Sequence, residues 1–270
     1  MRKVNVALAQ TVPVLNEVDR NLVAMAKLVE QTSLRQKIDL FVFPELSTTG
    51  YECGVRFADL ADRVEGRTVE SIAELAARYD TCIAFGMAER QKMESVVYSS
   101  GVLIDQQGEV VVAQQEVHLK AEQRLVFRPG FRLSVGKTRF GQVGLLVGWD
   151  LAFPEAARSL ALDGAELLCV LGSWERPFAH AWRSLIFARA YENAVHVAAC
   201  NRGGAEPSYA FCGESMAVGP LGTVNGHAEG ADPTVVTATI DLDEVHSAQE
   251  DTQLLQARQP RSYRQLVKMY

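Results

Sequence analysis

The sequence has little of several features that would narrow its class at once. Its 270 residues include five cysteines, an odd and scattered number without a CxxC pair, which argues against a disulfide framework or a zinc site. No apolar run approaches the ~20 residues that a membrane-spanning helix needs. The 33 acidic and 27 basic residues give a net charge of −6 without a long run of either sign. We therefore expect neither nucleic-acid nor membrane binding.

What is present is the composition of an ordinary globular protein, with 48% hydrophobic and 22% charged residues. The N-terminal apolar stretch alternates with Asn5 and Gln10, so it favours a first strand over a signal peptide. Together with the cysteine usage, this predicts a cytoplasmic protein. No segment is rich in proline, glycine and serine, so residues 1–270 are expected to form one domain. Its tail, from about Arg258 to Tyr270, lacks an apolar stripe and is either a frayed end or an arm reaching over a partner subunit.

Hydrophobic periodicity alternates between strand and helix in two halves of similar rhythm. Strands are expected at 4–9, 40–43, 82–86, 98–104, 110–112, 143–147, 167–171 and 195–199, with a later pair at 216–218 and 235–240. Helices are expected at 18–29, 69–79, 155–162 and 178–191. Helices placed between strands cover the outer faces of sheets, so the repeated rhythm predicts two sheets packed together.

Three blocks of sequence, in order, resemble the signatures of a known superfamily. They are Phe43-Pro44-Glu45-Leu46 with Thr49-Gly50-Tyr51, then Gly108-Glu109-Val110 with Val117-His118-Leu119 and Phe127-Arg128-Pro129-Gly130, then the run from Trp149 to Glu155. This pattern resembles the nitrilase (carbon–nitrogen hydrolase) superfamily, and later blocks extend the likeness over essentially the whole chain. The resemblance implies an α/β fold, a four-layer α-β-β-α sandwich. It also implies assembly into a homodimer or higher homo-oligomer through helices and the C-terminal tail.

Members of that superfamily hydrolyse nitriles, amides or carbamoyl groups with a Glu, a Lys and a Cys. The thiolate attacks the carbon and the carboxylate shuttles protons, while the ammonium and a backbone N–H stabilise the oxyanion. The resulting thioester is then hydrolysed. Because Glu45 follows Phe43-Pro44 at the end of a buried strand, the resemblance assigns it the role of general base.

The other two positions depart from the pattern. Glu116 stands two residues before His118-Leu119, where the resemblance implies the lysine, and Gly148 precedes Trp149-Asp150, where it implies the cysteine. Lys120 lies four residues on, roughly 13 Å along an extended strand, so it could replace the ammonium only after a sharp turn. Cys169 is better explained as a small buried hydrophobe than as a displaced nucleophile. The sequence therefore predicts a protein without thioester chemistry.

Three functions remain open for the altered pocket. The first is a non-catalytic protein that binds a small-molecule ligand or a partner. The second is an enzyme in which Glu45 and Glu116 act as an acid–base pair, because two carboxylates that repel each other keep at least one proton near neutral pH. The third is a site where these two residues, Glu122 and His118 hold a hard cation. The first is favoured, and it involves no metal and no cofactor.

The residues that accompany this pocket are also predicted. Glu122 adds to the acidic cluster, and the Trp149 backbone N–H points into the oxyanion site beside Gly148. Side chains expected at the ligand cavity are Tyr51, His118, Trp149, Phe153 and Trp174. His118 is more simply explained as a hydrogen-bonded structural histidine, while Asp150 and Arg158 are expected to support the turn from behind.

Overall fold

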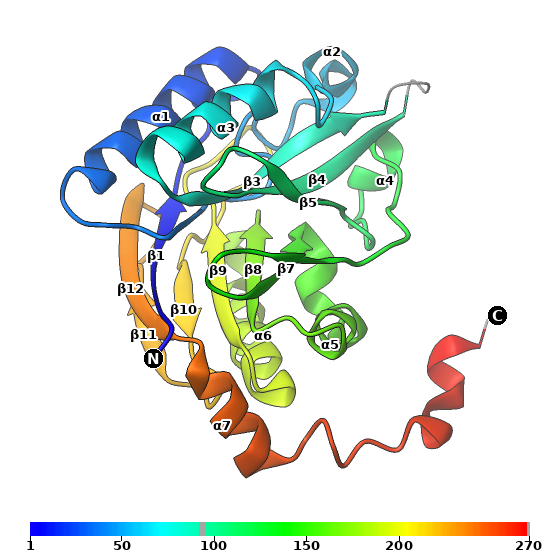
Figure 1. Cartoon of the computed structure of the whole chain (residues 1–270). Coiled ribbons are helices and arrows are strands. Elements are labelled where there is room, and N and C mark those ends of the chain that lie inside the picture. Colours follow the sequence, from blue (N-terminus) through cyan, green and yellow to red (C-terminus); the bar gives the residue numbers. More distant parts are fainter. Residues whose placement is uncertain (92–95, 269–270) are drawn as a thin grey trace.

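The computed structural model describes residues 1–91 and 96–268, which form two six-stranded sheets (Figure 1). The first sheet has the strand order β12 (Thr234–Asp241), β1 (Lys3–Gln10), β2 (Leu40–Val42), β3 (Cys82–Arg90), β4 (Val97–Ile104) and β5 (Val110–Gln115). The second has the order β11 (Val224–His227), β10 (Met216–Val218), β9 (His196–Asn201), β8 (Leu167–Gly172), β7 (Gln142–Val147) and β6 (Val135–Lys137). The predicted pair of sheets is confirmed.

Helices cover the outer face of each sheet (Figure 1). On the first sheet these are α1 (Val18–Ser33) and α3 (Arg67–Tyr79), and on the second α5 (Pro154–Leu162) and α6 (Ala179–Asn193). Shorter helices are α2 (Phe57–Leu60), α4 (Gln123–Val126), α7 (Asp243–Thr252), η1 (Gly54–Arg56), η2 (Gly148–Ala152), η3 (Arg176–Phe178) and η4 (Pro260–Val267). The four-layer α-β-β-α sandwich is therefore confirmed. Within the described residues, no helix is both long and apolar enough to cross a bilayer.

The main core lies between the two sheets. Leu8 on β1, Val42 on β2, Leu145 on β7 and Leu171 on β8 belong to one fully buried apolar cluster that spans both sheets. The three residues of β2 are buried on both faces, since the strand has a sheet on one side and helices on the other. This double burial explains why the strands appear in the sequence as continuous apolar runs.

One expectation about the C-terminal part needs correction. β10 and β12 do not pair with each other: β10 lies between β9 and β11, whereas β12 runs antiparallel to β1 in the other sheet. Apolar alternation marks a strand but does not say which sheet edge is free to accept it. The tail carries η4, whose Tyr263 and Leu266 line a pocket of about 510 Å³ together with Pro154 and Arg158 of α5. Leu266 and Val267 are exposed.

Three chain segments that leave strands of the two packed sheets position the candidate site. Glu45 follows β2, Glu116 follows β5 directly, and Gly148 begins η2 at the end of β7. Gly86 on β3 is required for this arrangement, because a Cβ there would lie 2.5 Å from the Cα of Glu45. The strand ends therefore bring together residues that are far apart in the sequence.

Candidate active site

Glu45 is a buried carboxylate at the bottom of the site. Its Oε1 accepts hydrogen bonds from the Ser99 hydroxyl at 3.0 Å and from the Gln123 side-chain amide at 2.9 Å. Burial is the main influence on this group and raises the pKa of Glu45 to about 7, against the lowering effect of its hydroxyl hydrogen bonds. Glu45 is therefore held in an environment that favours its protonated form up to neutral pH.

Glu116 occupies the space beside Gly148. Its Oε1 accepts a 2.9 Å hydrogen bond from the backbone N–H of Trp149, the donor that the sequence predicts for the oxyanion site. A Cβ on residue 148 would lie 2.9 Å from Cδ of Glu116 and from Oε2 of Glu45, and closer still to Oε1 of Glu116. Gly148 also has a φ of +53°, which glycine adopts without strain. The Glu116 carboxylate thus fills the volume that a side chain at position 148 would need.

The two glutamates are linked by Gln123, whose Nε2 donates to Oε1 of Glu45 at 2.9 Å and to Oε2 of Glu116 at 3.1 Å. Burial raises the pKa of Glu116 well above its ordinary value, and the nearby charges of Glu45 and Asp150 raise it further. A neutral amide cannot compensate two buried negative charges. The pair is consequently more stable with at least one proton bound.

The cavity above this pair is very small. It offers about 10 Å³ to a water-sized molecule, which is at the lower limit for one water. Its walls are formed by Glu45, Tyr51, Lys120, Gln123, Gly148, Trp149, Ser173, Trp174 and Glu175. Tyr51, Trp149 and Trp174 are thus placed at the cavity, and Trp174 also fixes the turn by donating its indole N–H to the Gly148 carbonyl at 3.0 Å. We name this space the inner cavity.

Lys120 lies closer to the site than its position in sequence indicates. The chain turns sharply after it, because Ala121 adopts a φ of +42° and leads into α4. Its ammonium does not bond either glutamate of the pair. It donates instead to both carboxylate oxygens of Glu175 at 2.8 Å and lies 4.1 Å from the centre of the Phe178 ring. The amine at this site is therefore engaged by a carboxylate of its own.

A second, larger cavity of about 440 Å³ lies next to the first and shares Tyr51, Lys120, Gln123 and Glu175 with it. We name it the outer chamber. Its further lining residues are Glu52, Gly54, Phe57, Ala121, Glu122, Leu125, Val126, Phe127, Phe178 and Tyr209. The Lys120–Glu175 ion pair lines both cavities and so lies where they meet.

Three further residues predicted for this pocket, Glu122, His118 and Phe153, do not lie beside the glutamate pair. The expected cluster around Glu45 and Glu116 is corrected on this point. Glu122 is exposed and accepts a 2.9 Å hydrogen bond from the Tyr209 hydroxyl, so it lines the outer chamber and not the glutamate pair. His118 and Phe153 stack with ring centres 3.7 Å apart and line a different pocket. Across residues 1–91 and 96–268, no group of His, Cys, Asp and Glu side chains is arranged to hold a metal. The proposed cation ligands do not converge, because the backbone turn at Ala121 sends Glu122 outward.

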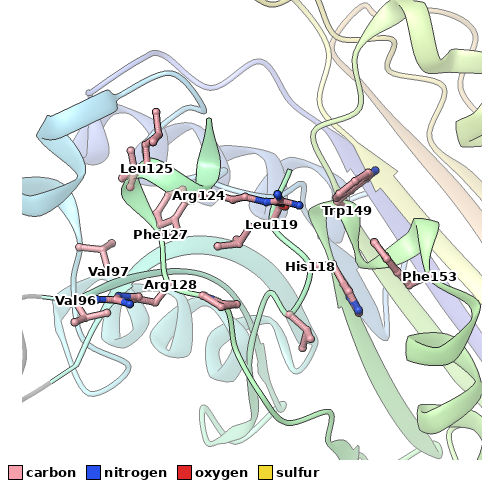
Figure 2. Close-up of a pocket in the computed structure, with 13 residues that line it drawn as sticks. Val96, Val97, His118, Leu119, Arg124, Leu125, Phe127, Arg128, Trp149 and Phe153 are labelled. Carbon is pink, nitrogen blue, oxygen red and sulfur yellow. Dashed lines mark hydrogen bonds between the residues drawn. The ribbon is translucent and has the colours of Figure 1, made fainter. Parts of the chain in front are cut away.

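That pocket has a volume of about 760 Å³ and shares only Trp149 with the inner cavity (Figure 2). Figure 2 shows His118 and Phe153 on one side of it and Arg124, Leu125 and Phe127 on the other. Its lining combines these apolar and aromatic side chains with Arg124 and Arg128. The glutamate pair does not open into it.

His118 and Asp150 are hydrogen-bonded to each other and hold the chain segments around the site in place. Asp150 is fully buried and accepts hydrogen bonds from the Val117 N–H, the His118 N–H and the His118 ring Nδ1, the last at 2.8 Å. It therefore fixes the segment that follows Glu116 against the turn that carries Gly148. Arg158 does not share this task as expected, because its Nη2 donates instead to the Glu192 carbonyl.

No thiol lines the inner cavity among the residues that the structure describes. The five cysteines are free and buried. Burial raises the pKa of the Cys53 and Cys82 thiols to about 11 and that of Cys212 to about 12, and it raises the pKa of Cys169 and Cys200 as well. Each is thus held in the protonated form, which is a poor nucleophile.

Sequence reasoning missed two residues of the site, Gln123 and Glu175. Gln123 reaches the pair only because of the left-handed turn at Ala121, and alanine gives no signal for that conformation. Glu175 directly follows Trp174, which the sequence predicts at the cavity. Its position next to Trp174 is the feature of the sequence that could have placed Glu175 at the cavity.

The fold and the buried Glu45 at the end of β2 define a class, the α-β-β-α hydrolases of the nitrilase type. The chain matches the carbon-nitrogen hydrolase family over residues 5–250 and belongs to it. It is 34% identical to a probable nitrilase of Schizosaccharomyces pombe, covering 98% of this chain and 99% of the relative. It is 34% identical to an (R)-stereoselective amidase of Pseudomonas sp., over 82% of this chain and 79% of the relative.

Solved structures share this fold. A carbon-nitrogen hydrolase of Helicobacter pylori superposes with a TM-score of 0.92 at 24% identity, covering 99% of both chains. An amidase of Nesterenkonia sp. superposes with a TM-score of 0.86 at 25% identity, covering 98% of this chain and 96% of that one. A further structure, of a mutant of that amidase, carries the acetamide moiety of fluoroacetamide on its active-site cysteine.

Proposed function

We propose that this member of the nitrilase superfamily does not perform thioester chemistry and instead uses its remodelled pocket to bind a small molecule or a protein partner. The observation that carries the proposal is the position of Glu116. Its carboxylate lies against Gly148, in the volume that a nucleophilic side chain at that position would need. It also takes the Trp149 N–H that would otherwise stabilise an oxyanion.

Two further observations support the same conclusion. The inner cavity of about 10 Å³ has no room for an amide or nitrile beside Glu45. The nearest amine, Lys120, is bound to Glu175. The thioester route requires a nucleophile, a free oxyanion donor and an ammonium. Gly148 supplies no nucleophile, and Glu116 occupies the N–H that would be the oxyanion donor. The ammonium of Lys120 is held by Glu175.

The proposal is tested by incubating the purified chain with amides, nitriles and N-carbamoyl compounds while measuring ammonia and the intact protein mass. We expect no ammonia above background and no acylated protein. The Glu45→Gln variant is the matched control, because contaminating hydrolase activity would persist in it. Ammonia release that depends on Glu45, together with an acyl adduct on any cysteine, would overturn the proposal.

A second candidate is favoured by the protonation of the pair. Glu45, with a pKa of about 7, and Glu116, whose pKa burial also raises, could act as base and acid on a bound substrate. Such an enzyme would release product without any covalent adduct. Its activity would be lost in both Glu45→Gln and Glu116→Gln. Turnover that survives either substitution would exclude it.

We further propose a homodimer formed through the C-terminal arm, in a cytoplasmic setting that the five free thiols support. Leu266 and Val267 on η4, and Tyr191 on α6, are exposed apolar side chains suited to burial against a second copy. Light scattering should give twice the chain mass for the parent. A monomer is expected for Leu266→Asp, whereas a monomeric parent would contradict the proposal.

A further inference from the structure

The outer chamber is a pocket of ligand size. Its volume of about 440 Å³ lies within the range of small-molecule sites, whereas the inner cavity is too small for more than a water. Its walls are largely aromatic, from Tyr51, Phe57, Phe127, Phe178 and Tyr209. The rings of Tyr51 and Tyr209 meet edge to face with their centres 5.3 Å apart. A ligand here would contact ring faces and edges over much of its surface.

Acidic side chains outnumber basic ones in the lining of the outer chamber. Glu52, Glu122 and Glu175 line it, and Lys120 is the one basic side chain among the described lining residues. Aromatic faces attract cations through their quadrupole, and carboxylates do so through their charge. Both kinds of wall therefore favour a positively charged guest over a neutral or anionic one.

Lys120 shows what the inner end of the chamber accommodates. Its primary ammonium donates to both oxygens of Glu175 at 2.8 Å and lies 4.1 Å from the centre of the Phe178 ring. The Glu175 side chain is only 12% exposed and that of Lys120 is 25% exposed, so the ion pair is largely shielded from water. Lys120 thus acts as an internal ligand in a niche built for an alkylammonium.

We propose that the outer chamber binds small organic cations whose primary ammonium replaces that of Lys120 at Glu175, with an alkyl or aryl body against the aromatic walls. This assignment rests on the proposed function, because it names the ligand class of the same non-catalytic pocket. Displacement of Lys120 exchanges one ammonium for another, so Glu175 remains paired. The gain comes from burying the apolar body of the ligand in the chamber.

The first test uses three probes of the same length on the full chain, with titration calorimetry as the measurement. Hexylammonium should bind, and 1-hexanol and hexanoate should bind at least tenfold more weakly or not at all, because they lack the charge or reverse it. Equal binding of hexylammonium and hexanol would overturn the proposal, since the chamber would then be only an apolar pocket. Preference for hexanoate would overturn it as well.

The second test uses two substitutions with opposite expected effects. Glu175→Gln should weaken hexylammonium binding about tenfold to a hundredfold, because it removes the charged acceptor. Lys120→Met should strengthen binding about tenfold, because it removes the internal competitor and leaves Glu175 free. Glu74→Gln, an exposed residue on α3, makes the same charge change away from the chamber and should leave the affinity unchanged.

A purely structural role for the ion pair predicts that both substitutions weaken binding in the same way, and that result would refute the proposal. If Glu175→Gln fails to fold, the Lys120→Met affinity and the probe series on the parent still decide the matter. Ammonia release from the amide panel reports on the proposed function separately. Absence of hexylammonium binding without any turnover would therefore overturn the cation site alone.

Discussion

Substitution of Gly148 by alanine tests whether Glu116 fills the nucleophile position. The added Cβ would meet Glu116 and Glu45 at 2.9 Å or less, and it would also have to adopt a φ of +53°. The left-handed backbone costs an L-residue about 1–2 kcal/mol, and overpacking a rigid site costs about 1–3 kcal/mol more. We expect Gly148→Ala to lower the free energy of unfolding by about 2–5 kcal/mol.

The two contributions can be separated by a second glycine and a second background. Gly54 has a φ of +55° and open space where its Cβ would be, so Gly54→Ala measures the left-handed cost alone. In a Glu116→Ala background the steric part should largely disappear. Gly148→Ala should then cost about as much as Gly54→Ala, which gives a coupling between positions 116 and 148 of about 1–3 kcal/mol.

Denaturant unfolding of the four proteins of the cycle, with Gly54→Ala beside them, provides the measurement. The analysis requires equal denaturant slopes, which show that the unfolded states are comparable. If Gly148→Ala costs the same with and without the Glu116 carboxylate, the two side chains do not compete for one volume. The structural argument for the proposed function would then fail.

Three further outcomes are expected. Folding raises the pKa of Glu45 and Glu116, so above pH ~5 the folded protein binds more protons than the unfolded chain. The free energy of unfolding should therefore fall toward pH 8, by up to about 1.4 kcal/mol per pH unit for each proton. Glu116→Gln should flatten this loss in unfolding midpoints, and parallel pH profiles would contradict it. Asp150→Ala should cost about 2–4 kcal/mol by leaving two partly buried N–H groups without their acceptor, and a loss below about 1 kcal/mol in urea unfolding would refute that role. Gly86→Ala should cost about 1–3 kcal/mol, since its Cβ would meet the Glu45 backbone, and an unchanged melting temperature would show that the approach is not tight.

The Lys120–Glu175 pair links the proposed function with the cation site. It lines both the inner cavity and the outer chamber, so a ligand that displaces Lys120 places its own ammonium beside the same carboxylate. The charge of Glu175 is one of the influences that raise the pKa of Glu45. Because the ammonium of the ligand replaces that of Lys120 and Glu175 stays paired, we expect ligand binding to change proton binding by the glutamate pair little.

The sequence by itself determined the layers of this protein and the central residues of its site. Apolar runs mark strands that are buried on both faces, and the spacing of helices between them requires two covered sheets. Motif spacing aligned Glu45, Glu116 and Gly148, and they meet because each follows a strand that ends at the site. Such features depend on local periodicity and on strand ends, which a sequence carries directly.

The tertiary structure alone decided which neighbours complete the site. The left-handed turn at Ala121 brings Gln123 onto the glutamate pair, turns Lys120 toward Glu175, and leaves Glu122 outside. It also decided that β12 pairs with β1 in the first sheet, whereas β10 and β11 lie in the second. A backbone turn of this kind is unfavourable for alanine and persists only because the surrounding contacts hold it. Those contacts come from distant parts of the chain, and no local pattern encodes them.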